Sequence, residues 1–248
     1  MSGTWPERAA GFALDRHARL ASTQDEARRR AQAGDREFVV VAGEQTGGHG
    51  RRGRDWTSPP GNLYATLVTR PGFAPSYLPA ASLIAATSLC EAIEELAPAP
   101  LPLAVKWPND VLLDGRKLAG LLLEMTRDAV LVGCGVNLRV APAAFPEAAT
   151  LAAHGAELEP APVLEGWLAA WARAAQALAA GDTESWRKAW LARAAGLDRP
   201  VRVMLAERRL DGVHRGIDAY GALRVETAAG LETVLAGDVE LVRPGEGA

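Results

Sequence analysis

The chain has few of the residues from which common nucleophilic and metal sites are built. Its 248 residues include two cysteines and four histidines. Cys90 and Cys134 stand far apart, and no paired Cys/His spacing occurs. This scarcity argues against a structural zinc site and against a disulfide framework. The sequence also lacks Gly-x-Ser-x-Gly, a local His/Cys dyad and a P-loop, so a mechanism with a protein nucleophile finds little support.

Charge and hydropathy argue against two further classes. The 27 basic and 30 acidic residues give a formal net charge of −3, which disfavours a protein built mainly to coat DNA or an anionic membrane. Residues 1–11 contain no apolar signal core, and no stretch is expected to reach the length of a membrane span. We therefore expect a soluble cytoplasmic protein. With 48% hydrophobic residues, the chain can bury the core of one large domain and a small one.

The most unusual stretch runs from Gly47 to Trp56 and contains four glycines and three arginines, and we call it the glycine loop. Guanidinium groups suit phosphate and carboxylate oxygens, and glycines let backbone N–H groups approach an anion. The loop therefore favours an anionic ligand. A solvated surface loop and a basic patch that contacts nucleic acid are the alternatives.

Hydrophobic patterning places this loop between two strands. Strands are predicted over residues 16–21, 38–42, 63–69, 101–107, 117–125 and 129–138. Helices are predicted over residues 22–33, 78–96, 162–180 and 183–194. Residues 196–200 form the best domain boundary, and the short strand candidates 201–206, 209–218, 222–227 and 232–236 predict a small antiparallel barrel. A loop that connects two strands in this way is a typical position for a binding loop.

Several polar residues stand where the pattern calls for apolar ones. Lys106 ends the apolar strand LPLAVKW, where it either serves as a fixed cation or only extends its ammonium group to water. Gly133 and Gly135 lie inside an apolar strand, which indicates a close approach of backbone or ligand, and Asn137 follows them. Ser22 and Thr23 either cap a helix or point two hydroxyls into a pocket.

These residues and their spacing resemble the biotin protein ligase (biotin–[acetyl-CoA-carboxylase] ligase) family. The resemblance covers roughly residues 16–244 and rests on Gln45-x-x-Gly48-x-Gly50-Arg51-Arg52-Gly53-Arg54-x-Trp56, Lys106-Trp107-Pro108-Asn109-Asp110, Gly115-Arg116-Lys117-Leu118-Ala119-Gly120, Gly133-x-Gly135-Val136-Asn137 and Ala236-Gly237-Asp238-Val239. It implies an α+β fold of the class II aminoacyl-tRNA synthetase/biotin ligase type, in which a mixed β-sheet packs with helices. The implied organisation is a lead-in over residues 1–15, a catalytic domain over 16–196 and an SH3-like β-barrel over 197–248.

The resemblance also implies the reaction and its residues. Biotin and ATP with Mg²⁺ form biotinyl-5′-AMP, and a lysine of a biotin carboxyl carrier protein then takes the biotin. Lys106 and Arg51 are implied to be catalytic. Biotin is implied to contact Ser22, Thr23, Gln24, Gln45, Gly48, His49, Gly50, Arg51 and Lys106. ATP or the adenylate is implied to contact Arg51, Arg52, Arg54, Trp56, Asn109, Lys117 and Asn137.

No dedicated metal site is expected beyond the Mg²⁺ that accompanies ATP, for which a place near Asp110 is left open. A homodimer is left open, and no DNA or membrane partner is expected. Some family members repress transcription through an N-terminal helix-turn-helix domain. Because only about 15 residues precede the catalytic domain, too few for such a domain, we expect a ligase without repressor activity.

Two residues depart from the family pattern, and two other functions compete with this one. Gln24 stands where Asn is common, and His49 stands where Arg is common, which removes one fixed charge from the loop. A lipoate–protein ligase of the same superfamily is the nearest alternative. A non-catalytic nucleic-acid-binding protein is a remote one, because the net charge is acidic and the basic stretch has a single aromatic residue.

Overall fold

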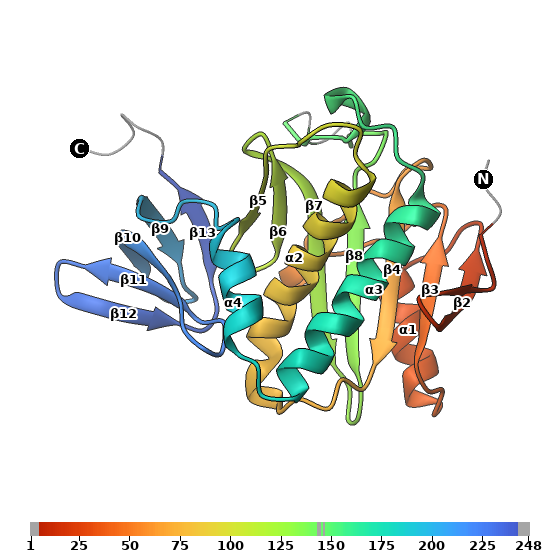
Figure 1. Cartoon of the computed structure of the whole chain (residues 1–248), viewed down its shortest axis with the longest axis horizontal. Coiled ribbons are helices and arrows are strands. Elements are labelled where there is room, and N and C mark those ends of the chain that lie inside the picture. Colours follow the sequence, from red (N-terminus) through yellow and green to blue (C-terminus); the bar gives the residue numbers. More distant parts are fainter. Residues whose placement is uncertain (1–4, 143–144, 146, 243–248) are drawn as a thin grey trace.

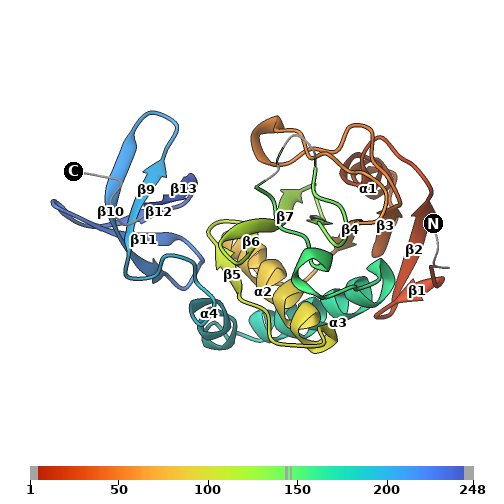
Figure 2. The same cartoon turned by 90° about the horizontal axis from the view of Figure 1, so that it is seen from above.

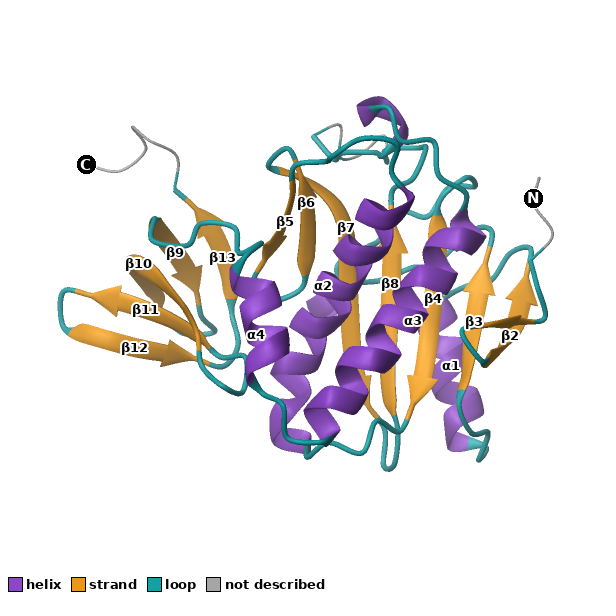
Figure 3. Cartoon of the chain, in the orientation of Figure 1, coloured by secondary structure: helices purple, strands orange, loops and turns teal. Residues whose placement is uncertain are grey.

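A computed structural model describes residues 5–142, 145 and 147–242. These residues form two β-sheets and four α-helices, coloured by type in Figure 3. The helices are α1 (Thr23–Gln32), α2 (Leu78–Leu96), α3 (Pro160–Ala179) and α4 (Glu184–Leu191). All four lie within about three residues of their predicted bounds, a normal margin for helix ends.

The larger sheet is mixed, as predicted. Its strands are β1 (Arg8–Ala9), β2 (Phe12–His17), β3 (Phe38–Ala42), β4 (Leu63–Thr69), β5 (Leu103–Lys106), β6 (Asp110–Leu113), β7 (Arg116–Met125) and β8 (Val130–Val136). Their spatial order is β1-β2-β3-β4-β8-β7-β6-β5. The pair β2–β3 is parallel, and the other pairs are antiparallel.

Helices cover this sheet unequally. In Figures 1 and 2, α2 and α3 lie across one face, and α1 lies on the other beside β3 and β4. The main core fills the α2–α3 side, whereas a small cluster that includes Ala27, Val40 and Val68 lies under α1. Because β3 is covered on both faces, its run of five residues is apolar throughout. The α1 side therefore leaves part of the sheet uncovered by a helix.

Helix α2 corrects one expectation from composition. The segment Pro75–Leu96 is long and apolar enough to span a membrane, although no such stretch was expected. In the fold, 72% of its most apolar window is buried inside the protein, against the sheet and α3. A core helix of a globular domain has the same length and composition.

The N-terminal region is more ordered than predicted. A loose lead-in was expected up to residue 15 and a strand over 16–21, but β1 and β2 already join the sheet from Arg8 onward; residues 1–4 lie outside the described part. The sequence of β2 is half polar, so periodicity does not reveal it. Its pairing with β3 and the ion pair between Asp15 and Arg30 of α1, at 2.6 Å, stabilise it instead.

The second sheet is antiparallel and open. Its strands are β9 (Pro200–Met204), β10 (Arg209–Ile217), β11 (Leu223–Thr227), β12 (Gly230–Val234) and β13 (Asp238–Leu241). In the described residues the order β12-β11-β10-β9-β13 ends without a pair between β12 and β13. The predicted antiparallel sheet is thus confirmed, whereas its closure into an SH3-like barrel is not. Strand β13 was not predicted, because it is stabilised by pairing with β9, which lies far from it in the sequence.

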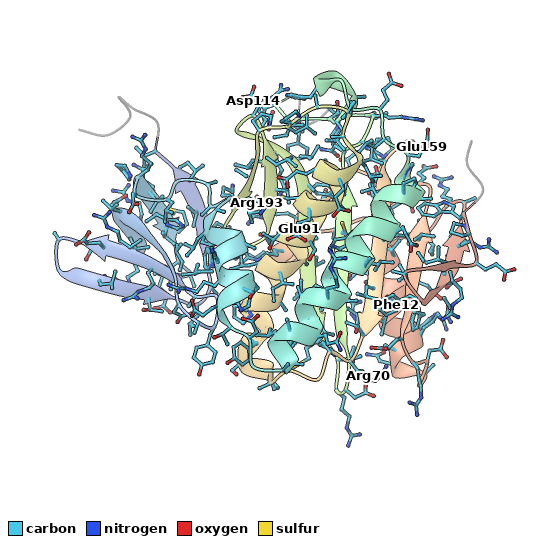
Figure 4. All side chains as sticks on the ribbon, in the orientation of Figure 1. Phe12, Arg70, Glu91, Asp114, Glu159 and Arg193 are labelled. Carbon is cyan, nitrogen blue, oxygen red and sulfur yellow. The ribbon has the colours of Figure 1, made fainter. Side chains whose placement is uncertain are left out.

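Three contacts dock this C-terminal sheet and the end of α4 onto the larger sheet beside β5 and onto α2 (Figure 2). The indole Nε1 of Trp107 donates to the backbone oxygen of Gly221 at 3.0 Å. The backbone N–H of Val105 donates to Arg193 O at 2.7 Å. The guanidinium of Arg193, labelled in Figure 4, pairs with Glu94 of α2 at 2.6 Å. The strand that carries Lys106 is therefore fixed from both sides.

Acidification should destabilise the joint between α4 and the C-terminal sheet. His214 is 1% exposed, and its ring stacks on Trp190 with centroids 5.8 Å apart. Burial lowers the pKa of His214 from its ordinary 6.5, and Asp198 offsets part of this effect. The unfolded chain then binds the proton more readily. The protein therefore keeps its full stability at pH values above the pKa that His214 has in the unfolded chain. As the pH falls below that value, the free energy of unfolding decreases by at most about 1.4 kcal/mol per pH unit.

Urea unfolding at about pH 7.5 and about pH 5.5 measures this effect. The wild type should lose more stability between the two values than His214→Phe, which cannot take up the proton at this position. An equal loss in both proteins would contradict the assignment to His214.

Candidate functional site

A cavity of about 470 Å³ lies on the α1 side of the larger sheet. Val68 of β4 and Leu131 of β8 pack under α1, and side chains two residues apart on a strand share a face. Thr66 and Gly133, each two residues along from these, therefore form the floor of the cavity. The start of α1, the glycine loop, the β5–β6 connection and β13 form its walls.

A chain of polar side chains occupies the end of the cavity near α1. Ser22 caps the helix by accepting from Asp25 N–H at 3.3 Å. Gln45 Oε1 accepts from Thr23 N and Oγ1 at 2.8 and 3.1 Å. The hydroxyl of Thr66 lies 3.0 Å from Thr23 Oγ1 and 3.2 Å from Gln24 Oε1. Both proposed roles of the Ser22–Thr23 pair therefore hold, since Ser22 caps α1 and both residues line the cavity.

The glycine loop forms a short hairpin over the cavity. Gly50 N–H donates to Arg54 O at 2.7 Å, and Trp56 N–H donates to Gly48 O at 2.9 Å. A Cβ on Gly48 would lie 2.6 Å from Trp56 O and 2.8 Å from Gln45 Nε2. This position therefore tolerates only glycine while the hairpin keeps its shape. His49 lines the cavity with its Nε2 4.0 Å from Asp25 Oδ1.

The indole of Trp56 rests directly on two glycines of the floor. A Cβ on Gly135 would lie 2.5 Å from Trp56 Nε1, and one on Gly120 would lie 3.3 Å from its ring. The ammonium of Lys117 stands 5.4 Å from the ring centroid, a cation–π distance. The glycine pair in β8 was predicted to admit backbone or a ligand, but the close neighbours are side chains: this indole at Gly135, and Gln24 Oε1, 2.7 Å from a Cβ on Gly133.

Two lysines share one carboxylate at the β5–β6 connection. Asp110 Oδ1 lies 2.7 Å from Lys117 Nζ, and its Oδ2 lies 3.4 Å from Lys106 Nζ. The side chain of Lys106 is 27% exposed and borders the cavity, so it is not a lysine that simply extends to bulk water. With two ammonium groups on its oxygens, Asp110 is poorly suited to a Mg²⁺ ion. The described residues contain no cluster of three His, Cys, Asp or Glu side chains for a metal.

Arg51 joins the glycine loop to the C-terminal sheet. Its Nη1 lies 3.3 Å from Asp238 Oδ1 and 3.5 Å from Asn109 Oδ1. Burial lowers the pKa of Arg51, and Asp238 opposes that effect. Since an arginine pKa starts far above neutrality, the group stays a cation facing the cavity.

Most of the predicted site residues are thus brought together. Those that line the cavity are Ser22, Thr23, Gln24, Gln45, His49, Gly50, Arg51, Arg54, Trp56, Lys106, Asn109, Asp110, Lys117 and Asn137. Gly48 belongs to the hairpin but does not line the cavity, and Arg52 does not line it either, with half of its side chain exposed. Sequence reasoning missed Thr66, which does not stand out as one of three hydroxyl residues in β4, and Ser58, which accepts from Gln45 Nε2 at 2.9 Å.

Three buried polar atoms of this cavity have no hydrogen-bond partner among the described residues. They are Gln24 Nε2, Trp56 Nε1 and Asn137 Oδ1. Burying such groups unpaired costs free energy, which a polar ligand can recover. Cys134 also lines the cavity, but burial raises the pKa of its thiol, so it is not a thiolate nucleophile at neutral pH. The arrangement suits binding and charge stabilisation of a polar, anionic ligand.

Comparisons with known proteins agree with this geometry. Residues 17–138 match the Biotin/lipoate A/B protein ligase family, and residues 196–242 match the Biotin protein ligase C terminal domain. A biotin–[acetyl-CoA-carboxylase] ligase of Paracoccus denitrificans is 38% identical over 90% of this chain and 98% of its own length. A bifunctional ligase/repressor of Bacillus subtilis is 31% identical over 91% of this chain and 73% of its own.

A solved structure shows the same fold. It is the biotin protein ligase from Aquifex aeolicus in complex with biotin and ATP, with a TM-score of 0.82 and 28% sequence identity over 93% of this chain and 99% of that one. The match spans both the catalytic sheet and the C-terminal sheet. The chain therefore belongs to the biotin/lipoate A/B protein ligase family.

Proposed function

We propose that this protein is a biotin–protein ligase that forms biotinyl-5′-AMP and transfers biotin to a lysine of a biotin carboxyl carrier protein. The observation that carries the proposal is the meeting of two kinds of surface in one cavity. Hydroxyl and amide groups gather at the α1 end, and lysine and arginine cations gather at the other. The names of the Paracoccus relative and the Aquifex complex support the same substrates.

In the first step a carboxylate oxygen of biotin attacks the α-phosphorus of ATP, and the bond to pyrophosphate breaks. Negative charge develops on the phosphoryl oxygens. Lys106 and Arg51 are cations on the wall where these oxygens would lie, and fixed cations stabilise such charge without reorganisation. Both reacting groups come from substrates, so no protein nucleophile is required. Mg²⁺ would arrive on the phosphates of ATP, because Asp110 is already paired with lysines and Asp238 with arginines.

In the second step the amine of the acceptor lysine attacks the acyl carbon of the adenylate, and AMP leaves with the bonding electrons. Between the steps the mixed anhydride must be kept from water. The hairpin of the glycine loop lies over the cavity and suits this task. Trp56 would cover the adenine, and Asn137 with its free Oδ1 would face the nucleotide.

The polar end of the cavity favours biotin over lipoate. A ureido ring offers a carbonyl and two N–H groups to Ser22, Thr23, Gln24, Gln45 and Thr66. The dithiolane ring of lipoate offers neither, so it would leave Gln24 Nε2, which has no partner among the described residues, without a hydrogen bond. Sites built to hydrogen-bond a ligand reject analogues that lack the bonding groups by about 10⁴-fold or more.

One assay tests the proposal. Purified protein is given radiolabelled biotin or radiolabelled lipoate with Mg-ATP and an isolated biotin carboxyl carrier domain. Label should pass only from biotin and only with ATP, and a carrier domain whose acceptor lysine is changed to arginine should stay unlabelled. Transfer of lipoate instead would favour the other branch of the family. The cytoplasmic location stays a prediction, and the homodimer stays open.

His49→Arg should slow the escape of the adenylate from the enzyme. An arginine at this position adds a fixed charge to the hairpin, near the phosphate that Arg51 is proposed to hold. We expect release to slow by about threefold, since one partly exposed charge contact contributes less than about 1 kcal/mol. Release is measured by chasing preformed labelled biotinyl-AMP with unlabelled biotin and ATP. Equal release rates in the two proteins would contradict the hypothesis that a loop with His49 holds biotinyl-AMP less tightly than a loop with arginine there.

A further inference from the structure

We propose that Asp238 of the C-terminal sheet holds the arginines of the glycine loop in place of nucleotide phosphate, and so lowers the affinity of the enzyme for ATP. The inference rests on the proposed function. It makes Asp238 a positioning residue, which holds the glycine loop but takes no part in the reaction.

Three guanidinium groups of one loop converge on this carboxylate. Arg51 Nη1 lies 3.3 Å from Asp238 Oδ1, Arg52 Nη1 lies 3.2 Å from Oδ2, and Arg54 donates to Oδ2 as well. The carboxylate is 28% exposed, so solvent screens these pairs only in part. Three like charges within four residues repel one another, and this single anion draws them together at the mouth of the cavity.

The carboxylate is not the only group that places Arg51. The backbone oxygen of Gly237 accepts from both Nη1 and Nη2 at 3.2 Å, and Asn109 Oδ1 lies 3.5 Å from Nη1. These neutral acceptors remain when the charge of Asp238 is removed. The net effect of the carboxylate is therefore mainly electrostatic.

Asp238 and the phosphates of ATP need the same donors. The carboxylate of Asp238 lies on the wall of the cavity that the phosphates would enter, and Arg51 and Arg54 face the same space. For ATP to gain these arginines, the ion pairs with Asp238 must break, and the freed carboxylate then repels the incoming phosphates. Both effects weaken nucleotide binding. A purely structural role would have the opposite sign, since loss of a structural contact loosens the loop and weakens binding.

Asp238→Asn should therefore bind ATP more tightly. We expect a Kd for Mg-ATP about fivefold lower than in the wild type, at the small end of coupling between sites. The Kd for biotin should change much less, because the ureido ring of biotin is proposed to lie at the opposite end of the cavity and only its carboxylate reaches Arg51. Isothermal titration of the full-length protein with each ligand alone measures both. The matched control is Asp211→Asn, which removes the same charge from β10, where Asp211 pairs with Arg202 and Arg209 and lies away from the loop.

Asp238→Glu keeps the charge and should bind ATP as the wild type does. A measurement on the wild type needs no variant. Hydrogen exchange of the turn at residues 235–238 should quicken when Mg-ATP binds, because the arginines leave this turn for the phosphates. Ligands usually slow exchange near their sites, so faster exchange is a distinctive result.

The outcomes separate this inference from the proposed function. Unchanged or weaker ATP binding by Asp238→Asn, or slower exchange of the turn on adding Mg-ATP to the wild type, would overturn the inference. If the wild type still transfers biotin, the proposed function stands. A wild type that binds neither biotin nor ATP would overturn the proposed function and this inference with it.

Discussion

Lys106→Ala should lower the rate of adenylate formation by about 100- to 1,000-fold, the usual cost of removing one group that stabilises transition-state charge. The ammonium borders the cavity at the end of β5, held 3.4 Å from Asp110. Docking of the C-terminal sheet fixes this strand, and the neighbouring Lys117 is itself held 2.7 Å from the other oxygen of Asp110. Single-turnover measurement of biotinyl-AMP formation, with both substrates saturating, isolates the chemical step.

Two other lysine variants make this result interpretable. Lys188→Ala removes a lysine from α4, away from the cavity, and should leave the rate unchanged. Lys106→Arg keeps the charge but spreads it over a planar group, so it should recover only part of the rate. Full activity of Lys106→Ala would mean that the lysine is a surface residue and that another group stabilises the phosphoryl oxygens.

The elements around the site were predictable because their patterns are local. Phe38–Ala42 and Leu63–Thr69 agree with the predicted strands residue for residue. A short, mainly apolar run with loop residues on both sides is typical of a buried strand. The dipeptide Asp114-Gly115 is by itself a hairpin signal in the sequence, and both residues adopt positive φ between β6 and β7, as such a turn requires. Among the strands that were not predicted, β2 and β13 are stabilised by pairing with distant strands, and that information is not local.

The same distinction applies to the site. Lys106 and the glycine loop were identifiable because each departs from the composition around it. Thr66 was not, because its importance lies in facing Thr23 across 43 residues of sequence. Asp238 was noticed only as part of a family motif, and its contact with Arg51 spans 187 residues. Residues that are unusual in their own segment can be found from sequence, whereas residues that matter through a distant partner require the fold.

Gly221→Ala should unfold the joint between the C-terminal sheet and α2. Gly221 has φ +87°, and a Cβ there would lie 2.6 Å from Ala80 N and 2.9 Å from Pro79 C. These are backbone atoms in the first turn of α2, which cannot move aside as a side chain can. Left-handed strain and overpacking together should cost about 3 kcal/mol. Urea unfolding of the variant and the wild type measures this loss of stability.

The chain provides a control with nearly the same backbone angle. Gly11 has φ +86° and no atom within 4 Å of its would-be Cβ, so Gly11→Ala carries the strain without the clash and should cost only about 1 kcal/mol. Because Gly221 O accepts the indole N–H of Trp107, the residue after Lys106, Gly221→Ala should also slow adenylate formation, and Gly11→Ala should not. Equal losses of stability in the two variants would show that the turn at Gly221 can shift to accept the methyl group without displacing α2. The C-terminal sheet would then not be what holds Lys106 in place.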